Sequence, residues 1–260
     1  MDVLAVIPAR AGSKSVPHKN IREIGGKPML AHSIDHALTS RYINRVIVST
    51  DSEEYAAIAK EYGAEVPFLR PAEYATDTAL DYDVFYHALT WLADNERYKP
   101  DLVVQLRPTY PIRNVEDIDN MIKLLIDHPE ADSVRSMSRA QEIPYKMWLQ
   151  DEVEISKELQ DIEMPSKAEQ LDSGTGTAMG RVKPLMTDIP ECYNMPRQEL
   201  PVAYYQNACI DIFRPDVVLY KKSMSGDYIL GYEMKENYDI DTEEDFEKAL
   251  NYLKQKRDNV

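Results

Sequence analysis

The stretch MDVLAVIPARAGSKSVPHKN, residues 1–20, decides the fold that we expect for this chain of 260 residues. Its apolar run Val3–Pro8 predicts a buried strand, and the small and cationic residues that follow predict a loop at the carboxyl end of that strand. A turn of small residues there lets backbone N–H groups approach phosphate oxygens. Arg10 adds a bidentate guanidinium group, and Lys14 and Lys19 add two point charges. The loop therefore suits a triphosphate; the alternative is an ordinary polar loop with solvated charges.

Apolar runs alternate with helix-like segments through the first half of the chain. The alternation predicts an α/β fold, with a parallel or mostly parallel sheet and helices on both faces. Ligands of such sheets bind beyond the carboxyl ends of the strands, so the loops after Ile7, Ser49 and Leu106 should line the site. The predicted strands are Val3–Pro8, Arg45–Thr50, Glu65–Leu69, Asp101–Leu106 and Ser133–Ser138, and the predicted helices are Pro28–Ser40, Ser52–Tyr62, Thr78–Asn95 and Val115–His128.

The stretch from about Ala140 to Gln198 has a different character, with prolines at positions 144, 165, 184, 190 and 196 and weak periodicity. One interpretation is a surface excursion of loops and short strands. The other is an inserted arm that closes the site or builds a dimer. Regular patterns return with a predicted strand at Ala208–Phe213 and a last helix at Glu243–Lys256.

A second chemical motif is YDIDTEED, residues 238–245. In an extended segment Asp239 and Asp241 project to the same side. Two hard carboxylates on one side suit Mg²⁺, which takes one or two protein carboxylates together with phosphate and water. The alternative is that Asp241 or Thr242 caps the last helix, and the two interpretations are compatible.

Composition excludes several classes of protein. The net charge of −15 argues against a nucleic-acid partner, which would need a basic surface. The apolar runs are too short to span a bilayer and no basic leader precedes the first strand, so we expect no membrane partner and a cytoplasmic location. Cys192 and Cys209 lack the spacing of a zinc site and are predicted to be buried thiols.

Six segments occur in the order found in acylneuraminate cytidylyltransferases (CMP-sialic acid synthetases), and the chain resembles that family over nearly its whole length. The resemblance implies a three-layer α/β/α fold with a Rossmann-like sheet of the nucleotide-diphospho-sugar transferase type. It implies one nucleotidyltransferase domain, residues 1–260, with a small inserted dimerisation arm at about 140–200. The segments are IPARAGSKSVPHKN (7–20), STD (49–51), LRPAEYATDTA (69–79), PTYPIR (108–113), PRQELP (196–201) and DIDT (239–242).

The resemblance also implies an activity and a set of site residues. The activity is transfer of CMP from CTP to an acidic acceptor, most simply a nonulosonic sugar acid, with release of pyrophosphate, by a Mg²⁺-dependent homodimer. Catalytic positions are Arg10, Lys19, Asp239 and Asp241, of which Asp239 and Asp241 match the metal carboxylates. The CTP positions are Arg10, Ser13, Lys14, Lys19, Asn20 and Arg70, and the acceptor positions are Arg107, Lys146, Arg197, Gln206 and Asn207.

Two residues depart from the family pattern, and both concern the acceptor. Arg107 replaces a glutamine that contacts the sugar acceptor in the family, and Ala208 stands where glycine is common. An arginine there is suited to a carboxylate, phosphate or phosphonate, or it pairs with a nearby acid such as Asp77 or Asp81. The alternatives are therefore CTP-dependent activation of a phosphonate or another anion, use of a different nucleotide, and a non-catalytic nucleotide-binding homologue.

Overall fold

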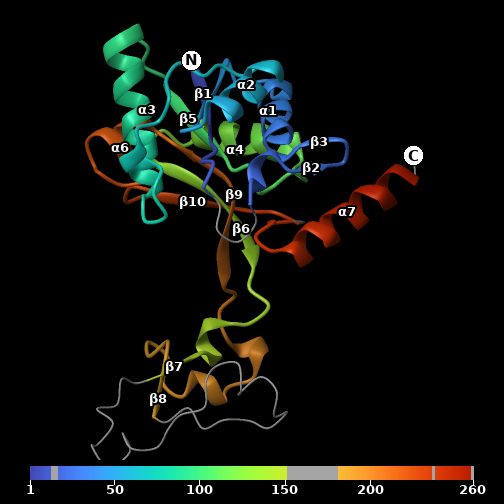
Figure 1. The fold of residues 1–260 in the computed structure, drawn as a ribbon. Coiled ribbons are helices and arrows are strands. Elements are labelled where there is room, and N and C mark those ends of the chain that lie inside the picture. Colours follow the sequence, from blue (N-terminus) through green and yellow to red (C-terminus); the bar gives the residue numbers. More distant parts are fainter. Residues whose placement is uncertain (13–16, 151–180, 236–237, 259–260) are drawn as a thin grey trace, which may run out of the picture. The chain divides into compact units, whose positions relative to one another are not determined.

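A computed structural model describes residues 1–12, 17–150, 181–235 and 238–258 of the chain (Figure 1). Its contacts divide it into two compact units. The larger unit combines Met1–Ser138 with Gln206–Val260, and the smaller unit is Arg139–Tyr205. Each unit is described by itself.

The larger unit is built on a six-stranded sheet with the strand order β10-β6-β9-β5-β1-β4. Strand β1 is parallel to both of its neighbours, since Val6 lies opposite Ile47 on one side and Gln105 on the other. Strand β9 runs antiparallel to β5, and β10 is parallel to β6, so the prediction of a mostly parallel sheet is confirmed. The strands are β1 (Val3–Pro8), β4 (Arg45–Ser49), β5 (Leu102–Leu106), β6 (Ser133–Arg139), β9 (Tyr204–Phe213) and β10 (Ile229–Glu233).

Helices cover both faces of the sheet, and the first strand shows why. Val3, Ala5 and Ile7 point into a core with helices α1 (Met29–Thr39), α2 (Glu53–Glu61) and α4 (Val115–Asp127). Leu4 and Val6 point into a second core with α3 (Asp81–Glu96) and α6 (Pro215–Leu219). Side chains of a strand alternate between its faces, and an apolar residue at every position lets β1 serve two cores. Figure 1 shows the resulting layers, with α3 and α6 on one side and α1 and α2 on the other.

The last helix, α7 (Glu243–Asp258), packs through Phe246 and Ala249 against a separate small core that includes Ile240. The short hairpin of β2 (Glu23–Ile24) and β3 (Lys27–Pro28) contributes to this core as well. Its turn is formed by Gly25 and Gly26, both at positive φ, a conformation that glycine adopts without steric cost. The core connects the segment after the first loop with the YDIDTEED motif.

The smaller unit holds a two-stranded antiparallel sheet of β7 (Trp148–Gln150) and β8 (Val182–Pro184). Short 3-10 turns make up most of the rest of its described part: η3 (Pro144–Lys146), η5 (Cys192–Asn194) and η6 (Arg197–Glu199). The expected loops and short strands are therefore found here. Cys192 in this unit and Cys209 in the larger unit are buried free thiols, as predicted.

Several boundaries differ from the sequence prediction. Glu65–Leu69 is not a strand; it forms an isolated bridge between Glu65 and Ile47, because Pro67 cannot donate to a ladder. The helix predicted from Thr78 begins at Asp81. Strand β10 was not predicted at all. The N-cap of α2 is confirmed, since the Ser52 side chain accepts a hydrogen bond from the Tyr55 N–H at 3.3 Å.

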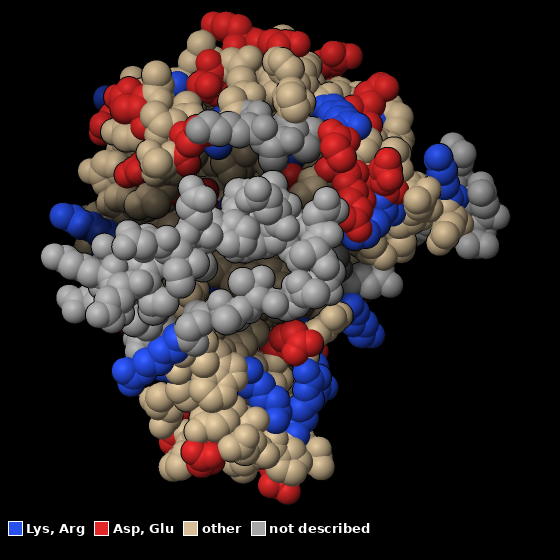
Figure 2. All heavy atoms as spheres, turned by 60° about the horizontal axis from the view of Figure 1, so that its bottom comes forward, with Lys and Arg blue, Asp and Glu red and all other residues tan. Residues whose placement is uncertain are grey.

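No helix in the described ranges is long and apolar enough to cross a membrane. The surface reflects the net charge of −15. On the face drawn in Figure 2, acidic side chains outnumber basic ones over the larger unit. Any anion-binding site must therefore concentrate cations locally.

Candidate active site

A cavity of about 560 Å³ opens in the larger unit at the carboxyl ends of β1 and β5. Its walls come from the loop after β1, the segment from Arg70 to Val84, the loop after β5, and Asp241. A second cavity of about 780 Å³ lies beside the start of α4 and contains none of the predicted phosphate-binding residues in its lining. The ionisable residues lining the first cavity are Arg10, Lys19, Arg70, Tyr74, Asp77, Asp81, Arg107 and Asp241.

The loop after β1 is held by its neighbours. The Asn20 side chain donates a hydrogen bond to the Arg10 carbonyl oxygen at 3.0 Å, and the Ala11 N–H donates to the Asp51 carboxylate at 2.9 Å. The Asp51 contact explains how the STD segment at the end of β4 serves the site. The Arg10 guanidinium group forms an ion pair with Asp77 at 2.9 Å. Ser13 and Lys14, which the sequence assigns to CTP, lie outside the described residues.

Arg70 supports the cavity from within. Only 5% of the residue is exposed, and its guanidinium group donates to the Ser49 hydroxyl at 3.1 Å, to the Ser49 carbonyl and to the Tyr74 carbonyl. Burial lowers the pKa of Arg70 to about 10, so the group stays charged at neutral pH. These bonds join the end of β4 to the turn η2 (Ala72–Tyr74), which leads to Asp77. Arg70 therefore stabilises the segment of the cavity wall that contains Asp77, the ion-pair partner of Arg10.

The YDIDTEED motif reaches the cavity from the far end of the chain. The Ile240 N–H donates to the Thr109 carbonyl oxygen at 3.0 Å, which places this segment beside the loop after β5. The Lys19 ammonium group then lies 2.8 Å from the Asp241 carboxylate. Thr242 and Asp245 exchange hydrogen bonds at the start of α7, so the capping interpretation is confirmed alongside the placement of Asp241 at the cavity.

Asp239 is the more buried of the two candidate metal carboxylates. Its Oδ2 atom accepts a hydrogen bond from the Tyr110 hydroxyl at 2.8 Å. Its Oδ1 atom is buried, and no group of the described residues hydrogen-bonds to it. Burial raises the pKa of Asp239, the Tyr110 hydrogen bond opposes the rise, and the Asp241 charge adds to it. Burial also raises the pKa of Tyr110, which keeps its hydroxyl protonated and able to donate.

These two carboxylates fit a divalent cation that also binds a nucleotide. A buried carboxylate oxygen without a partner is costly unless something else satisfies it, and Mg²⁺ would do so. Nowhere in the described ranges do three or more His, Cys, Asp or Glu side chains gather as metal ligands. A cation here would therefore need further oxygens from phosphate and water, which is the coordination that Mg²⁺ prefers.

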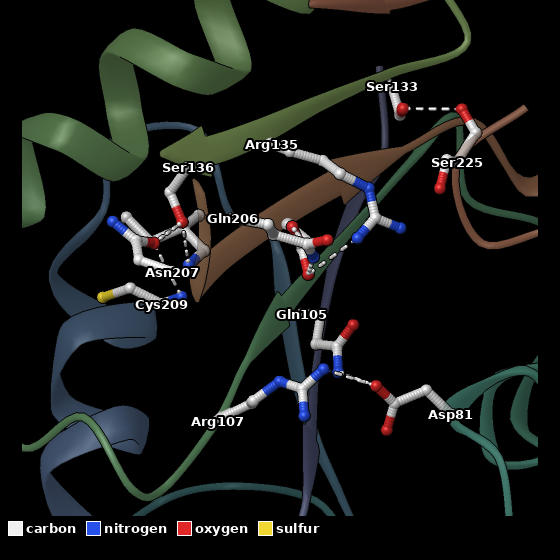
Figure 3. A network of polar contacts seen from close by, with 12 residues as sticks. Asp81, Gln105, Arg107, Ser133, Arg135, Ser136, Gln206, Asn207, Cys209 and Ser225 are labelled. Carbon is white, nitrogen blue, oxygen red and sulfur yellow. Dashed lines mark hydrogen bonds and ion pairs between the residues drawn. The ribbon is translucent and has the colours of Figure 1, made fainter. Parts of the chain in front are cut away.

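Arg107 lines the cavity and is paired with an acid. Its guanidinium group lies 2.5 Å from the Asp81 carboxylate, which also accepts a hydrogen bond from Gln105 at 3.1 Å (Figure 3). Of the two acids considered for this pair, the structure selects Asp81, while Asp77 binds Arg10. The Nε atom of Arg107 is buried and has no hydrogen-bond partner within the described part of the chain. The Arg107 side chain as a whole is 33% exposed, so other N–H groups of its guanidinium can reach a ligand in the cavity.

Gln206 and Asn207 precede the point where β9 lies against β5. Asn207 is 4% exposed, and its side chain accepts from the Ser136 hydroxyl at 2.5 Å (Figure 3). The same side chain donates to the Ser138 hydroxyl at 2.9 Å. This side chain is therefore occupied in joining β9 to β6. Gln206 is exposed and donates weakly to Asp211 at 3.3 Å. The Asn207 side chain therefore stabilises the contact between β9 and β6. Its contact with an acceptor stays a prediction.

Lys146 and Arg197 belong to the smaller unit. The Lys146 ammonium group donates to the Tyr193 carbonyl oxygen at 3.1 Å, and Arg197 pairs with Glu142 at 2.9 Å. These contacts stay within that unit. Their predicted part in acceptor binding remains a prediction.

The sequence did not reveal Tyr110 as part of the site, and it suggested Asp77 as a partner of Arg107, whereas Asp77 pairs with Arg10. Tyr110 lies within the PTYPIR segment. A signal was available, because an aromatic residue with a polar tip directly after a buried strand needs a hydrogen-bond partner for that tip.

A mostly parallel sheet whose strand-end loops gather cations beside two carboxylates defines a nucleotide-binding transferase site. The chain belongs to the cytidylyltransferase family, whose profile matches residues 4–260. The resemblance found in the sequence motifs is thereby confirmed.

Individual relatives support this membership. An N-acylneuraminate cytidylyltransferase of Escherichia coli O18:K1:H7 is 32% identical over 256 residues, which are 98% of this chain and 52% of that protein. This chain thus spans about half the length of that relative. The post-translational flagellin modification protein B of Campylobacter coli is 32% identical over 257 residues, covering 98% of this chain and 96% of that protein. A CMP-N,N'-diacetyllegionaminic acid synthase of Legionella pneumophila is 44% identical over 126 residues, which are 48% of this chain and 53% of that protein.

Solved structures share the fold at low sequence identity. A CMP:2-keto-3-deoxy-manno-octonic acid synthetase complexed with CTP superimposes with a TM-score of 0.68 at 16% identity, covering 98% of this chain and 100% of that chain. A 4-diphosphocytidyl-2C-methyl-D-erythritol synthase from Anaerococcus prevotii gives a TM-score of 0.60 at 14% identity, covering 97% of this chain and 98% of that chain. These likenesses confirm the predicted α/β fold.

Proposed function

We propose that this protein transfers CMP from CTP to an acidic small molecule and releases pyrophosphate. The observation that carries the proposal is the meeting of Arg10 and Lys19 with Asp241 around one cavity, although they come from opposite ends of the chain. The second carboxylate, Asp239, lies two residues before Asp241 and is held by Tyr110. Support for CTP comes from the family match and from the CTP that the structural neighbour is described as binding. A triphosphate carries about four negative charges near neutral pH, which explains the local gathering of cations.

In the reaction a hydroxyl oxygen of the acceptor attacks the α-phosphorus of CTP, and the bond to the pyrophosphate oxygen breaks in line. Such reactions ask the protein mainly for positioning and for neutralisation of charge. Arg10 and Lys19, freed from Asp77 and Asp241 by the nucleotide, neutralise the leaving pyrophosphate. Mg²⁺ held by Asp239 and Asp241 would supply charge neutralisation on the phosphate oxygens.

The acceptor that we propose first is a nonulosonic sugar acid. The supporting observation is the naming of the relatives, which act on N-acylneuraminate, on N,N'-diacetyllegionaminic acid and, in Campylobacter jejuni, on pseudaminic acid. Within the chain, Arg107 lines the cavity with 33% of its side chain exposed, and its guanidinium group suits an acidic group.

A second candidate acceptor is a phosphonate or another small anion, whose own anionic oxygen would attack the α-phosphorus of CTP as pyrophosphate leaves. Arg107 favours it as well, because a guanidinium group binds phosphonate oxygens as readily as carboxylate oxygens. The two candidates differ in the acceptor and share the CTP site.

The experiment that tests the proposal is pyrophosphate release from CTP, UTP and GTP with Mg²⁺ and a panel of acids. The panel holds N-acetylneuraminate, legionaminic and pseudaminic acids, and a 2-aminoalkyl phosphonate. Release with CTP and one sugar acid is the expected result. Release with the phosphonate alone would select the second candidate. CTP binding without turnover of any acid would instead support a non-catalytic nucleotide-binding homologue.

We also propose that the protein is a homodimer formed through the smaller unit. The described part of that unit exposes several large hydrophobic side chains, and exposed apolar patches mark interaction sites. A homodimer buries such a surface against its own copy. The molar mass in solution, measured by light scattering for the parent and for Trp148→Asp, tests this, and equal monomeric masses would contradict it. The exposed residues are Met147, Trp148, Leu149, Val182, Leu185, Val202, Tyr204 and Tyr205.

A further inference from the structure

Tyr110 is a buried residue in the loop after β5 and contacts Asp239, one of the two candidate metal carboxylates. It follows β5 by four residues, and 2% of it is exposed. Its backbone N–H donates to the Arg107 carbonyl oxygen at 3.3 Å, so the loop that carries Arg107 also fixes the start of this side chain. The guanidinium group of Arg113 lies 5.9 Å from the centre of its ring. The ring is thus held on several sides before its hydroxyl makes any contact.

The Tyr110 hydroxyl contacts two acceptors from distant parts of the chain. One is the Asp239 Oδ2 atom at 2.8 Å, and the other is the carbonyl oxygen of Asn207 on β9. Because Tyr110 donates to only one carboxylate oxygen of Asp239, the two oxygens differ in their hydrogen bonding. Oδ2 accepts from Tyr110, whereas Oδ1 is buried and has no partner among the described residues.

We infer that Tyr110 is a positioning residue that turns the Asp239 carboxylate so that Oδ1 is presented to a divalent cation. The inference rests on the proposed function, which places that cation on Asp239 and Asp241. Asp241 has a different anchor, since 67% of its side chain is exposed and it pairs with Lys19. A hydrogen bond to one oxygen restricts the orientation of a carboxylate, and loss of such an outer partner lowers metal affinity by about ten- to hundredfold.

The test compares two substitutions that each remove one hydroxyl from a buried tyrosine. Tyr110→Phe removes the donor to Asp239 and keeps the ring. Tyr55→Phe is the matched control, because Tyr55 is fully buried and its hydroxyl has no hydrogen-bond partner in the described part of the chain. Binding of Mn²⁺ in the presence of CTP is measured for each protein by electron paramagnetic resonance, and CTP binding is measured separately without metal.

The expected result is a dissociation constant for Mn²⁺ that rises about ten- to hundredfold in Tyr110→Phe and stays unchanged in Tyr55→Phe. The midpoint of thermal unfolding shows that both variants fold, and metal-free CTP binding should be equal in all three proteins. Partial recovery of Tyr110→Phe activity at high Mg²⁺ is the second expected readout.

The outcomes separate this inference from the proposed function. If the parent binds Mn²⁺ and Tyr110→Phe binds it equally well, the positioning role is wrong while the metal site stands. If the parent binds Mn²⁺ no better than Asp239→Asn, the metal assignment itself is wrong, and the inference falls with it. Should Tyr110→Phe fail to fold, a fluorinated tyrosine at position 110 nearly keeps the shape and strengthens the hydrogen bond that the hydroxyl donates to Asp239, and unchanged Mn²⁺ binding would overturn the role.

Discussion

The Arg107 guanidinium group lies 2.5 Å from the carboxylate of Asp81, and both residues line the cavity. Asp81 is the first residue of α3, and Gln105 steadies its carboxylate from β5. Two elements thus hold Arg107 in place before any ligand arrives. A cation held this firmly on a cavity wall is suited to selecting the acceptor.

Replacing Arg107 with glutamine should change the acceptor preference while leaving CTP affinity similar. The charge removed lies beside Asp81, whereas the cations assigned to phosphate are Arg10 and Lys19. Discrimination between an anionic acceptor and its neutral analogue should fall about tenfold or more, since a charge-assisted hydrogen bond contributes about 1.5–3 kcal/mol. The ratio of kcat/KM values for the two acceptors measures this. Arg41→Gln, whose side chain is 73% exposed, is the control. A large loss of CTP binding in Arg107→Gln would place Arg107 on the nucleotide instead.

Asp239→Asn should nearly abolish turnover while the fold survives. The substitution keeps the shape and removes the charge, and loss of a metal carboxylate costs several kcal/mol, or about a thousandfold in rate. Pyrophosphate release and a thermal unfolding curve are the two measurements. Asp227→Asn serves as the control, because that carboxylate is 88% exposed and pairs with Lys221. CMP transfer near the parent rate would show that Asp239 does not hold the cation.

Ala208→Gly should stabilise the protein. Ala208 has φ of 58°, a left-handed conformation that costs about 1 kcal/mol for a residue with a Cβ atom and nothing for glycine. Allowing for the extra freedom of glycine in the unfolded chain, we expect a gain of up to about 1 kcal/mol in urea unfolding. Ala93→Gly, inside α3, should lose about 1 kcal/mol in the same assay. Destabilisation by Ala208→Gly would mean that contacts of the Ala208 methyl group outweigh the backbone strain.

The stability of the larger unit should fall in mild acid because of His36. Burial and the nearby Arg113 charge lower the pKa of His36 from 6.5 to about 2. Between these values the unfolded chain binds a proton that the folded chain does not. Stability is therefore intact above a pH of about 6.5 and is lost as the pH falls, at up to about 1.4 kcal/mol per pH unit.

Urea unfolding across this pH range compares the parent with His36→Gln, which keeps an acceptor for Arg113. The variant should show a shallower fall in the free energy of unfolding. Equal slopes in the two proteins would remove His36 from the acid response.

The central strands and the larger helices could be predicted from local patterns alone. Val3–Pro8 and Leu102–Leu106 are apolar at nearly every position because both of their faces are covered, and such runs are visible without tertiary information. Strand β10 was missed because ILGYE contains a glycine and lies at an exposed edge of the sheet. The exposure of an edge strand weakens the periodicity on which prediction depends.

The residue types of the site could be predicted from the sequence, but most of the ion pairs and hydrogen bonds between those residues could not. The cations after β1 and the carboxylates at 239 and 241 stand out in the sequence. Their partners do not, because Arg10 meets Asp77 and Lys19 meets Asp241 only through the folding of β1, β4 and β5. The role of Tyr110 depends on a bond between residues 129 positions apart, which no local pattern encodes.

Two aspartates pair with the cations that we assign to phosphate, and this pairing affects how nucleotide affinity responds to salt. Arg10 and Lys19 already carry counterions in Asp77 and Asp241. An arriving triphosphate exchanges one set of anions for another and displaces few ions from solution. Added electrolyte screens the ligand and the resident aspartates alike. Nucleotide affinity should therefore vary less with ionic strength than it would at a bare cluster of lysines and arginines.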